Sequence, residues 1–503
     1  MVAAVTHAAP RPIDSHPALA RLSDLSLLRA RSYVDGQWTG GSASDSMIVV
    51  VDPATGSPVA RVAAGGVHDV DRAITAAVRA QADWRALLPQ ARAARLRGWH
   101  AHIVAAAQDL ALIITLEQGK PMAEARGEVA YAASFVEWFA EESRRVGAEA
   151  VASHLPGAEM MVRREPLGVV GLVTPWNFPS AMLTRKAAAA LAAGCTVVAH
   201  PSSHTPLSAL ALAELAARAG FPAGVLNVVP GPSEAIVNRL CDDTRVRGLS
   251  FTGSTEIGRL IAARCAPTMK RLVMELGGHA PLIVFADADL ERAVDIAIGA
   301  KFATSGQDCL AANRLYVERP LYAAFCAAFA ARAARLKVGA GLDHGSEIGP
   351  LIHERAVAKV EQHVRDAVAR GARCLSGGAG SPLGPLFYAP TVLADVPDDA
   401  LIMREETFGP VAALAPFDSE DEVVARANVT EYGLAAYVVT RDGSRGLRLS
   451  RRLEYGMIAV NRVRITGAPI PFGGVKQSGL GREGARHGLE AFTDLKYVCL
   501  DTE

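Results

Sequence analysis

The sequence predicts an α/β fold made of two doubly wound, parallel-sheet lobes, with a small β-hairpin set apart from both. The chain has 503 residues, whereas a single hydrophobic core stops growing near about 250 to 300 residues. From about residue 167 onward, apolar strand-like segments alternate with helix-like segments, which is typical of parallel sheets with helices on both faces. The composition, 50% hydrophobic and 21% charged, is that of an ordinary globular protein.

Charge and composition favour a small-molecule role. The 52 basic residues balance the 52 acidic ones, so we expect neither a nucleic-acid nor a membrane-surface partner. The apolar run 187–199 falls short of the about 20 residues that a membrane span needs, and the first 22 residues lack the features of a secretion signal. Seven scattered cysteines without a Cys-x-x-Cys pair favour reduced thiols in the cytoplasm over a disulfide framework or a zinc site.

The first part of the chain predicts a scaffold. Residues 1–25 are expected to form a loose N-terminal tail, and residues 32–38 a hairpin that turns at Asp35–Gly36. Residues 149–165 read as a polar-edged hairpin around Pro156–Gly157, and such an excursion often contacts another subunit. The remaining expected elements are a strand over 46–51 and helices over 69–82, 87–107 and 124–146.

The next part, up to Gly277, predicts the first parallel sheet. A buried strand after Arg164 is followed by helices over 180–193, 208–219, 233–240 and 254–264, and by strands over 196–199, 225–229, 248–251 and 272–276. Such sheets bind ligands at the carboxyl ends of their strands. No G-x-G-x-x-G fingerprint occurs, but the strand that runs through Gly253 and Ser254 into a helix could hold a phosphate. A plain strand-to-helix turn is the alternative.

A second α/β pattern begins after Gly277–Gly278, the expected boundary between the lobes. It predicts strands over 282–285, 315–317, 411–415, 435–439 and 457–461, and helices over 290–302, 321–336, 354–369, 419–427 and 444–453. Cys309 lies between the first of these helices and the strand over 315–317, after a Ser-Gly-Gln turn where a thiol can be exposed. It is a candidate nucleophile, although most cysteines are small buried hydrophobic residues.

Six short motifs lie at or next to the ends of the predicted strands and in the loops of this fold. They are Thr174-Pro-Trp-Asn-Phe-Pro179, Phe251-Thr-Gly-Ser254, Glu275-Leu-Gly-Gly278, Gly306-Gln-Asp-Cys309, Glu405-Glu-Thr-Phe-Gly-Pro410 and Pro471-Phe-Gly-Gly-Val-Lys-Gln-Ser-Gly479. Together they resemble the aldehyde dehydrogenase superfamily, from about Tyr33 to Val498.

The resemblance implies a division of the chain into domains. Both lobes are expected to be Rossmann-like, with a cofactor-binding domain over 26–148 and 167–277 and a catalytic domain over 278–485. An oligomerisation element over 149–166 and 486–503 is expected to build a homodimer or a homotetramer.

The resemblance also implies a reaction. A thiolate on Cys309 attacks an aldehyde, and the Asn177 amide and the Cys309 backbone N–H stabilise the oxyanion. Hydride transfer to NAD or NADP leaves a thioester, and Glu275 activates the water that hydrolyses it. Lys186 matches a lysine near the cofactor, and Glu483 matches a carboxylate assigned to proton relay.

The expected cofactor contacts depart from the family pattern at the adenosine end. Where most members have Lys-Pro-x-Glu, this chain has His200-Pro-Ser-Ser203. Ser203 removes the charge that repels a 2′-phosphate, and a partly protonated His200 could replace the lysine. We therefore predict use of both NAD and NADP. The expected cofactor-binding residues are Pro175, Trp176, His200, Ser202, Ser203, Gly231, Gly253, Ser254, Leu276, Glu406 and Phe408.

Within the superfamily, the chain looks most like succinate-semialdehyde dehydrogenases. Their substrate's carboxylate needs arginines; Arg185 matches one, whereas Ala303 occupies the other position. We hypothesise that Arg462 or Arg464 replaces the missing contact, with Thr466 also in the substrate site; two solvated arginines are the alternative.

Other activities stay open at this point. A sulfonated or longer dicarboxylic semialdehyde is the main alternative substrate. A CoA-acylating dehydrogenase is disfavoured by Glu275, and a non-catalytic structural protein by the presence of Cys309 and Asn177.

Two neighbours of the nucleophile also depart from the pattern. Asp308 stands where threonine is usual, and its charge should raise the pKa of the Cys309 thiol. Ala311 replaces a second cysteine found in some relatives, so no disulfide with Cys309 is expected.

Overall fold

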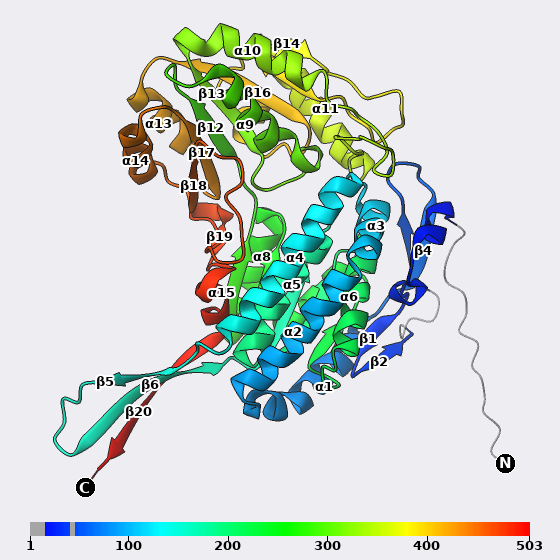
Figure 1. The fold of residues 1–503 in the computed structure, drawn as a ribbon, viewed down its shortest axis with the longest axis vertical. Helices are drawn as coiled ribbons and strands as arrows, with labels where there is room; N and C mark the ends of the chain where they lie inside the picture. The colour runs from blue at the N-terminus through cyan, green and yellow to red at the C-terminus, as the bar shows by residue number, and fades with distance from the viewer. Residues whose placement is uncertain (1–15, 41–45, 503) are drawn as a thin grey trace.

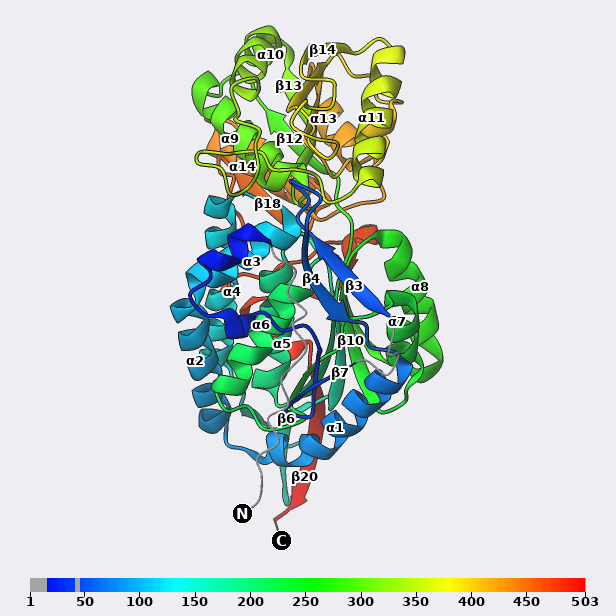
Figure 2. The same cartoon turned by 90° about the vertical axis from the view of Figure 1, so that its right-hand side faces the viewer.

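The computed structural model describes residues 16–40 and 46–502. Two α/β lobes are stacked along the long axis, and a slender β arm projects from the larger lobe (Figure 1). Turned by 90°, the molecule shows the two lobes one above the other (Figure 2).

The larger lobe is organised around an eight-stranded sheet. Its five central strands are parallel, while β19 and β1 join its edges antiparallel. In spatial order the strands are β19 (Gly479–Leu480), β11 (Arg271–Glu275), β10 (Val246–Thr252), β7 (Val169–Thr174), β8 (Thr196–Pro201), β9 (Leu226–Val228), β1 (Ser32–Val34) and β2 (Gln37–Thr39). The central strands β7 and β8 are buried along their whole length because helices cover both faces of the sheet.

One face of this sheet packs against α2 (Pro89–Ala105), α3 (Ala107–Gln118), α4 (Met122–Glu142), α5 (Pro179–Ala193) and α6 (Pro206–Arg218). The other face packs against α1 (Val67–Ala86), α7 (Ser233–Asp242) and α8 (Thr255–Cys265). Every side chain of α5 is buried, which explains its run of small alanines between the sheet and the outer helices.

The smaller lobe contains a seven-stranded sheet that is parallel except at one edge. In order the strands are β14 (Arg373–Ser376), β15 (Thr391–Ala394), β16 (Val411–Phe417), β13 (Ala312–Glu318), β12 (Ala280–Val284), β17 (Ala435–Val439) and β18 (Met457–Val460). Its helices are α9 (Leu290–Phe302) and α10 (Arg319–Ala333) on one face, and α11 (Glu354–Ala369), α12 (Leu401–Arg404), α13 (Glu420–Asn428) and α14 (Gly443–Arg452) on the other.

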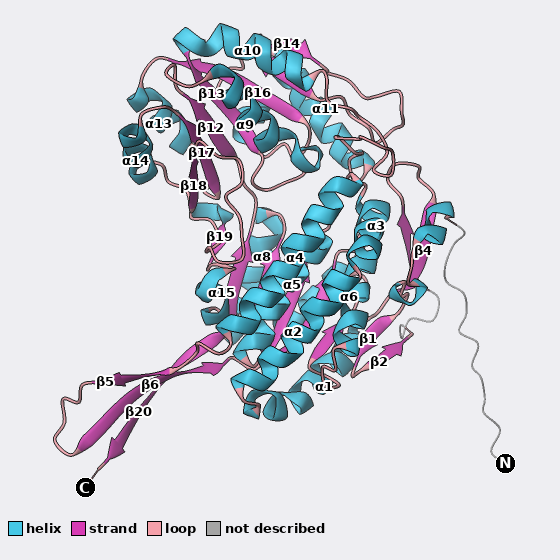
Figure 3. Cartoon of the chain, in the orientation of Figure 1, coloured by secondary structure: helices cyan, strands magenta, loops and turns pink. Residues whose placement is uncertain are grey.

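The arm is a three-stranded antiparallel sheet. It consists of β5 (Ala148–Val151), β6 (Ala158–Pro166) and β20 (Thr493–Asp501), and it stands clear of both lobes (Figure 3). A separate hairpin, β3 (Met47–Val51) with β4 (Pro58–Ala63), and the short helix α15 (Ala485–Glu490) complete the larger lobe.

The expected elements are present, with shifts of a few residues at their ends. The hairpin turn has Asp35 at φ 55° and Gly36 at φ 75°, the left-handed pair that a two-residue turn requires. The structure adds elements that were not expected, including α3, β4, β14, β15, α15 and β20. The fold class is confirmed.

Two domain assignments differ from the structure in detail. The expectation of a loose tail over 1–25 is wrong for residues 16–25, where the 3₁₀ helix η1 (Pro17–Arg21) buries Leu19. The Asp109 carboxylate also accepts hydrogen bonds from the N–H groups of Ser23 and Asp24, both at 2.9 Å. Residues 1–15 lie outside the described residues. The expected boundary at 485 groups β19 with the smaller lobe, whereas β19 pairs with β11 of the larger one.

None of the described helices is by itself long and apolar enough to span a membrane. Only α2 and α3 taken together, a pair bent by 71°, pass that test of length and composition.

The parallel strands of the larger lobe face the smaller lobe with their carboxyl ends, whereas those of the smaller lobe face the larger lobe with their amino ends. β7, β10 and β11 point their carboxyl ends toward the smaller lobe, and the segments that follow them reach the space between the lobes. The smaller lobe contributes the segments that precede β13 and β16. The expectation that the site lies at the carboxyl ends of the strands is therefore met by the sheet of the larger lobe, whereas the smaller lobe contributes segments from the amino ends of its strands.

Candidate active site

A cavity of about 630 Å³ lies between the lobes and contains Cys309. Asn177, Gly253 and Leu276 reach it from the larger lobe, and Cys309 and Glu406 reach it from the smaller one. The predicted residues among those that line it are Pro175, Trp176, Asn177, Arg185, Gly253, Ser254, Leu276, Cys309, Glu406, Phe408, Arg464 and Thr466.

The loop that presents Cys309 is wound in an unusual conformation. The 3₁₀ turn η4 (Ala303–Gly306) ends with Thr304, Ser305 and Gly306 at φ 51°, 56° and 71°. A β-branched threonine in the left-handed region is strained, so the surroundings must hold it there. A Cβ on Gly306 would lie 2.2 Å from the Gly409 carbonyl, so only glycine fits at this turn.

Gln307 ties the loop to both lobes. Its side-chain Oε1 accepts a hydrogen bond from the Ile352 N–H at 3.0 Å, and its backbone carbonyl accepts one from the Asn177 amide at 3.0 Å. These contacts bring the predicted oxyanion donor next to the nucleophile loop. The glycine pair before β12 permits the same approach, because a Cβ on Gly278 would lie 2.1 Å from the Cys309 carbonyl.

Asn177 is itself held by a buried ion pair. Lys120 donates to the Asn177 carbonyl at 2.7 Å and to the Glu128 carboxylate at 2.7 Å. Glu128 also accepts the N–H of Ser180 at 2.9 Å, at the start of α5. Removing one partner of a buried pair leaves an uncompensated charge, so this pair fixes the loop that carries Asn177.

Cys309 is half-buried and lines the cavity. Burial of the thiol, then the charges of Asp308 and Glu406, raise its pKa well above the ordinary value, and Arg185 opposes them. The charge of Asp308 acts in the predicted direction, although burial is the larger cause.

Glu275 is buried at the end of β11, and neither of its carboxylate oxygens has a hydrogen-bond partner among the described residues. Burial and then the charge of Glu483 raise its pKa well above the ordinary value. A carboxylate with a raised pKa and free lone pairs is suited to accept a proton near neutral pH. A Cβ on Gly473 would lie 2.9 Å from Glu275 Oε1, so glycine there leaves room for this side chain.

Glu483 joins two cationic side chains of α5, and its charge acts on Glu275. It forms a buried ion pair with Lys186, and a second with Arg185 at 2.5 Å from Nε. Lys186 also donates to the Ser250 hydroxyl at 2.9 Å. Burial, opposed by these cations, leaves Glu483 with a lowered pKa, so it stays ionised and supplies the negative charge that raises the pKa of Glu275.

The residues predicted to bind the cofactor pyrophosphate lie at the start of helix α8. Ser254 caps this helix by accepting the N–H of Ile257, and it is exposed. The Thr252 hydroxyl beside it is buried without a hydrogen-bond partner in the part of the chain that is described, and a Cβ on Gly253 would lie 2.4 Å from the Phe251 ring. Gly253 has no side chain, the N-terminus of α8 offers backbone N–H groups, and the Thr252 hydroxyl has a free hydrogen-bonding capacity. These features suit the binding of a pyrophosphate.

The residues predicted for the nicotinamide end also line this cavity. Glu406 accepts the N–H of Gly278 at 2.9 Å, and burial raises its pKa to about 7. Phe408, at φ 55°, and Trp176 meet edge to face with centroids 5.6 Å apart.

His200, Ser202, Ser203 and Gly231 lie outside this cavity lining. His200 is buried, with Nδ1 at 2.9 Å from the Val229 carbonyl and Nε2 at 2.9 Å from the Ser233 hydroxyl. Burial lowers its pKa to about 4. The expectation that a partly protonated His200 could replace the missing lysine is therefore wrong, because the ring is neutral at physiological pH.

One of the two candidate loop arginines lies at the cavity. Both Arg462 and Arg464 are exposed, but only Arg464, with Thr466, lines the cavity. Arg185 lines it from α5, and its guanidinium lies 4.1 Å from the centre of the Phe472 ring.

Sequence reasoning missed Lys120, Glu124 and Tyr131, which lie on or just before α4. Glu124 and Tyr131 line the cavity, and Lys120 holds Asn177. The seven-residue spacing of Glu124 and Tyr131 on one helix face was the available signal, but it pointed equally to a scaffold helix.

Comparison with known proteins agrees with this geometry. The model of the aldehyde dehydrogenase family matches residues 38–498. The chain is 51% identical to an aspartate-semialdehyde dehydrogenase (non-phosphorylating) of Halomonas elongata, over 95% of this chain and 97% of that one. It is 49% identical to a succinate-semialdehyde dehydrogenase [NADP(+)] of Escherichia coli, over 95% and 99%.

A solved structure gives the same picture. The crystal structure of succinate-semialdehyde dehydrogenase from Burkholderia pseudomallei matches with a TM-score of 0.94 at 49% identity, covering 95% of this chain and 99% of that one.

Proposed function

This chain belongs to the aldehyde dehydrogenase family, and from that premise we propose that it oxidises a short aldehyde with a distal anionic group to the acid, using NAD or NADP. Succinate semialdehyde is the simplest such substrate. The observation that carries the proposal is one cavity that gathers a thiol, an amide donor and a buried arginine, with an unpartnered carboxylate beside it. The relatives named for aspartate and succinate semialdehydes act on four-carbon aldehydes of this kind.

The chemistry starts at Cys309. Its thiolate adds to the aldehyde carbon, and the Asn177 amide, held by Lys120 and Gln307, donates to the developing oxyanion. A bound NAD(P)⁺ would supply the hydride acceptor that converts the thiohemiacetal on Cys309 to a thioester. Thr252, Gly253 and Ser254 would hold the pyrophosphate, and Glu406 the nicotinamide ribose.

Glu275 completes the reaction. The thioester on Cys309 must be hydrolysed, and a carboxylate without hydrogen-bond partners can take the proton from an attacking water. Glu483, kept ionised by its ion pairs with Lys186 and Arg185, raises the pKa of Glu275 and so favours this proton transfer. This hydrolytic route favours an acid-forming enzyme over a CoA-acylating one.

The direct test is a panel of aldehydes assayed by NAD(P)H absorbance. We expect kcat/KM for succinate semialdehyde to exceed that for the neutral four-carbon aldehyde butanal by about a hundredfold, because a buried charge-assisted contact contributes about 1.5–3 kcal/mol. Cys309→Ala should abolish turnover. Equal rates with both aldehydes, or turnover that requires CoA, would refute the proposal.

Dual cofactor use is the second part of the proposal. Ser203 supplies no negative charge against a 2′-phosphate, and His200 is neutral. We expect kcat/KM values for NAD and NADP within a thousandfold of each other. A larger NAD preference would exclude dual use.

We also propose that the arm of β5, β6 and β20 joins subunits into a homodimer or homotetramer. Leu495, Tyr497 and Leu500 of β20 are exposed, and such apolar side chains favour contact with another subunit. Sedimentation of the intact protein should give a multiple of the chain mass, and a monomer would contradict this.

A further inference from the structure

Two carboxylates in the cavity have no role in the reaction described above. Glu124 comes from the first turn of α4 in the larger lobe, and Asp308 from the nucleophile loop of the smaller lobe. Both line the cavity together with Cys309 and Arg185, so a substrate held at the thiol lies beside them.

Glu124 has one oxygen engaged and one without a partner. Oε1 accepts the N–H of Thr304 at 2.9 Å. Oε2 is buried and has no hydrogen-bond partner within residues 16–40 and 46–502. A buried polar atom without a partner is costly, and a donor brought by a ligand would remove that cost.

Asp308 adds a second carboxylate to the cavity lining, and we call Glu124 and Asp308 together the acidic wall. Its Oδ1 accepts the N–H of Leu310 at 3.0 Å, and its charge acts on Glu124 and on Tyr131 across the cavity. Burial raises the pKa of both carboxyls, and a cation placed between them would lower it again.

The nearby cations each pair with another carboxylate, although Nη1 of Arg185 has no hydrogen-bond partner among the described residues. Lys120 pairs with Glu128 at 2.7 Å, and Arg185 pairs with Glu483 at 2.5 Å. Across the described residues, neither Glu124 nor Asp308 forms an ion pair with a cationic side chain within 4 Å. The charge of Lys120 acts on both acids and that of Arg185 on Asp308, but none of the described cationic side chains forms an ion pair with either acid.

Ala303 is the reason why none of the described cationic side chains forms an ion pair with the acidic wall. It is exposed into the cavity, next to Thr304, which Glu124 binds. A methyl group there leaves open space and no charge, where a long cationic side chain would neutralise both acids and occupy the space between them.

We propose that Glu124 and Asp308 bind an ammonium group on the substrate, so that the preferred substrate is a zwitterionic amino-acid semialdehyde. Three points would then fix it: the aldehyde at Cys309, the carboxylate at Arg185 and Arg464, and the ammonium at the acidic wall. The inference rests on the proposed aldehyde oxidation and adds the amino group to it. The amine takes no part in bond making.

The test compares two substrates that differ by that group alone. L-aspartate 4-semialdehyde and succinate semialdehyde have the same four carbons, the same aldehyde and the same distal carboxylate. We expect the wild-type kcat/KM ratio to favour the amino-bearing substrate by at least about tenfold, the range of one charge-assisted hydrogen bond. Glu124→Gln and Asp308→Asn should each reduce that ratio by at least about tenfold, mainly through KM.

Glu137→Gln is the matched control, because Glu137 lies on the same helix but is exposed and outside the cavity lining. It should leave the ratio unchanged. A wild-type preference for succinate semialdehyde, or a ratio unaltered in both pocket variants, would overturn the ammonium site while the proposed function stands. Absence of turnover with either aldehyde would refute the proposed function and this inference with it.

Discussion

At the residue scale, Cys309 must be reactive in a setting that disfavours its thiolate. Burial and the charges of Asp308 and Glu406 raise the thiol pKa, and Arg185 is the nearby cation that opposes them. Because the nucleophile is the thiolate, any change that removes negative charge here should widen the pH range over which it reacts.

Asp308 offers the sharpest change of this kind. Asp308→Asn keeps the shape of the side chain and removes its charge, so the pKa of Cys309 should fall and alkylation by iodoacetamide should begin at lower pH. The rate of alkylation measured as a function of pH reports this shift. A profile that coincides with that of the wild type would show that the Asp308 charge does not reach the thiol.

The residues that could be predicted from the sequence are those that belong to linear motifs. Cys309, Glu275 and Asn177 each lie in a short segment whose order along the chain resembles the family. Glu124 and Lys120 could not be predicted, because their roles depend on contacts with Thr304 and Asn177, which lie 180 and 57 positions away. The neutrality of His200 likewise follows from burial, which its neighbours in sequence do not reveal.

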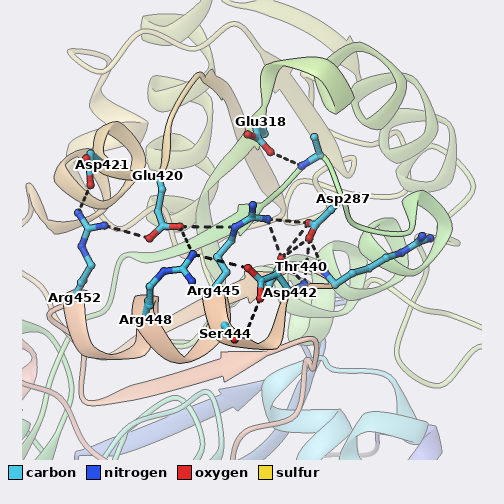
Figure 4. Close-up of polar contacts among 12 residues, drawn as sticks. Asp287, Glu318, Glu420, Asp421, Thr440, Asp442, Ser444, Arg445, Arg448 and Arg452 are labelled. Carbon is cyan, nitrogen blue, oxygen red and sulfur yellow. Dashed lines mark hydrogen bonds and ion pairs between the residues drawn. The ribbon is translucent and has the colours of Figure 1, made fainter.

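At the element scale, helix α14 illustrates how a short helix is secured to a lobe. Its arginines at 445, 448 and 452 lie on one face, and they meet acidic groups of α13 and of the segment after β12 (Figure 4). Arg445 pairs with Asp287 at 3.1 Å and lies 4.3 Å from the centre of the Phe285 ring. This network holds α14 against the sheet, since only Gly446 and Leu449 of the helix are buried.

Asp287 is the centre of that attachment. Its carboxylate accepts the Thr440 hydroxyl at 2.9 Å and the N–H of Arg441 at 3.1 Å, in addition to pairing with Arg445. Asp287→Ala should therefore lower the stability of the smaller lobe by about 2 kcal/mol, measured as a lower urea midpoint.

Asp421→Ala is the control for this substitution. Asp421 pairs with Arg452 at 2.6 Å but its side chain is 87% exposed, so the expected change is below about 1 kcal/mol. Equal midpoints for the two variants would mean that the network around Asp287 is no stronger than a solvated ion pair.

Elements with a clear apolar pattern could be predicted, including the five-residue strands β11 and β12. The twelve-residue helix α3 could not, because ten of its side chains are buried and its sequence shows no polar face. The two-residue strand β19 exists only because Gly479 pairs with Glu275 of β11, a contact about two hundred positions away along the chain. β20 lacks an apolar alternation, since most of its side chains are exposed and its partner is β6. In both cases tertiary pairing, and not local propensity, sets the conformation.

At the scale of the whole molecule, the two lobes each hold an incomplete site. The first sheet supplies Glu275 and Asn177, and the smaller lobe supplies Cys309. Glycines at 278, 306 and 473 allow the three segments to approach. The two-lobe α/β architecture could be predicted from chain length and alternation, but the opposed ends of the two sheets could not, because they depend on how the lobes pack.

The central claim is that Cys309 forms a thioester which Glu275, from the other lobe, helps to hydrolyse. Glu275→Gln separates these steps, since glutamine keeps the shape but cannot take a proton. With substrate and NADP, rapid mixing should give a burst of one NADPH per active site, then a steady rate lowered by about 10²- to 10⁴-fold, with the acyl group found on Cys309 by intact mass. A steady rate equal to that of the wild type, or loss of the burst together with the adduct, would contradict the account.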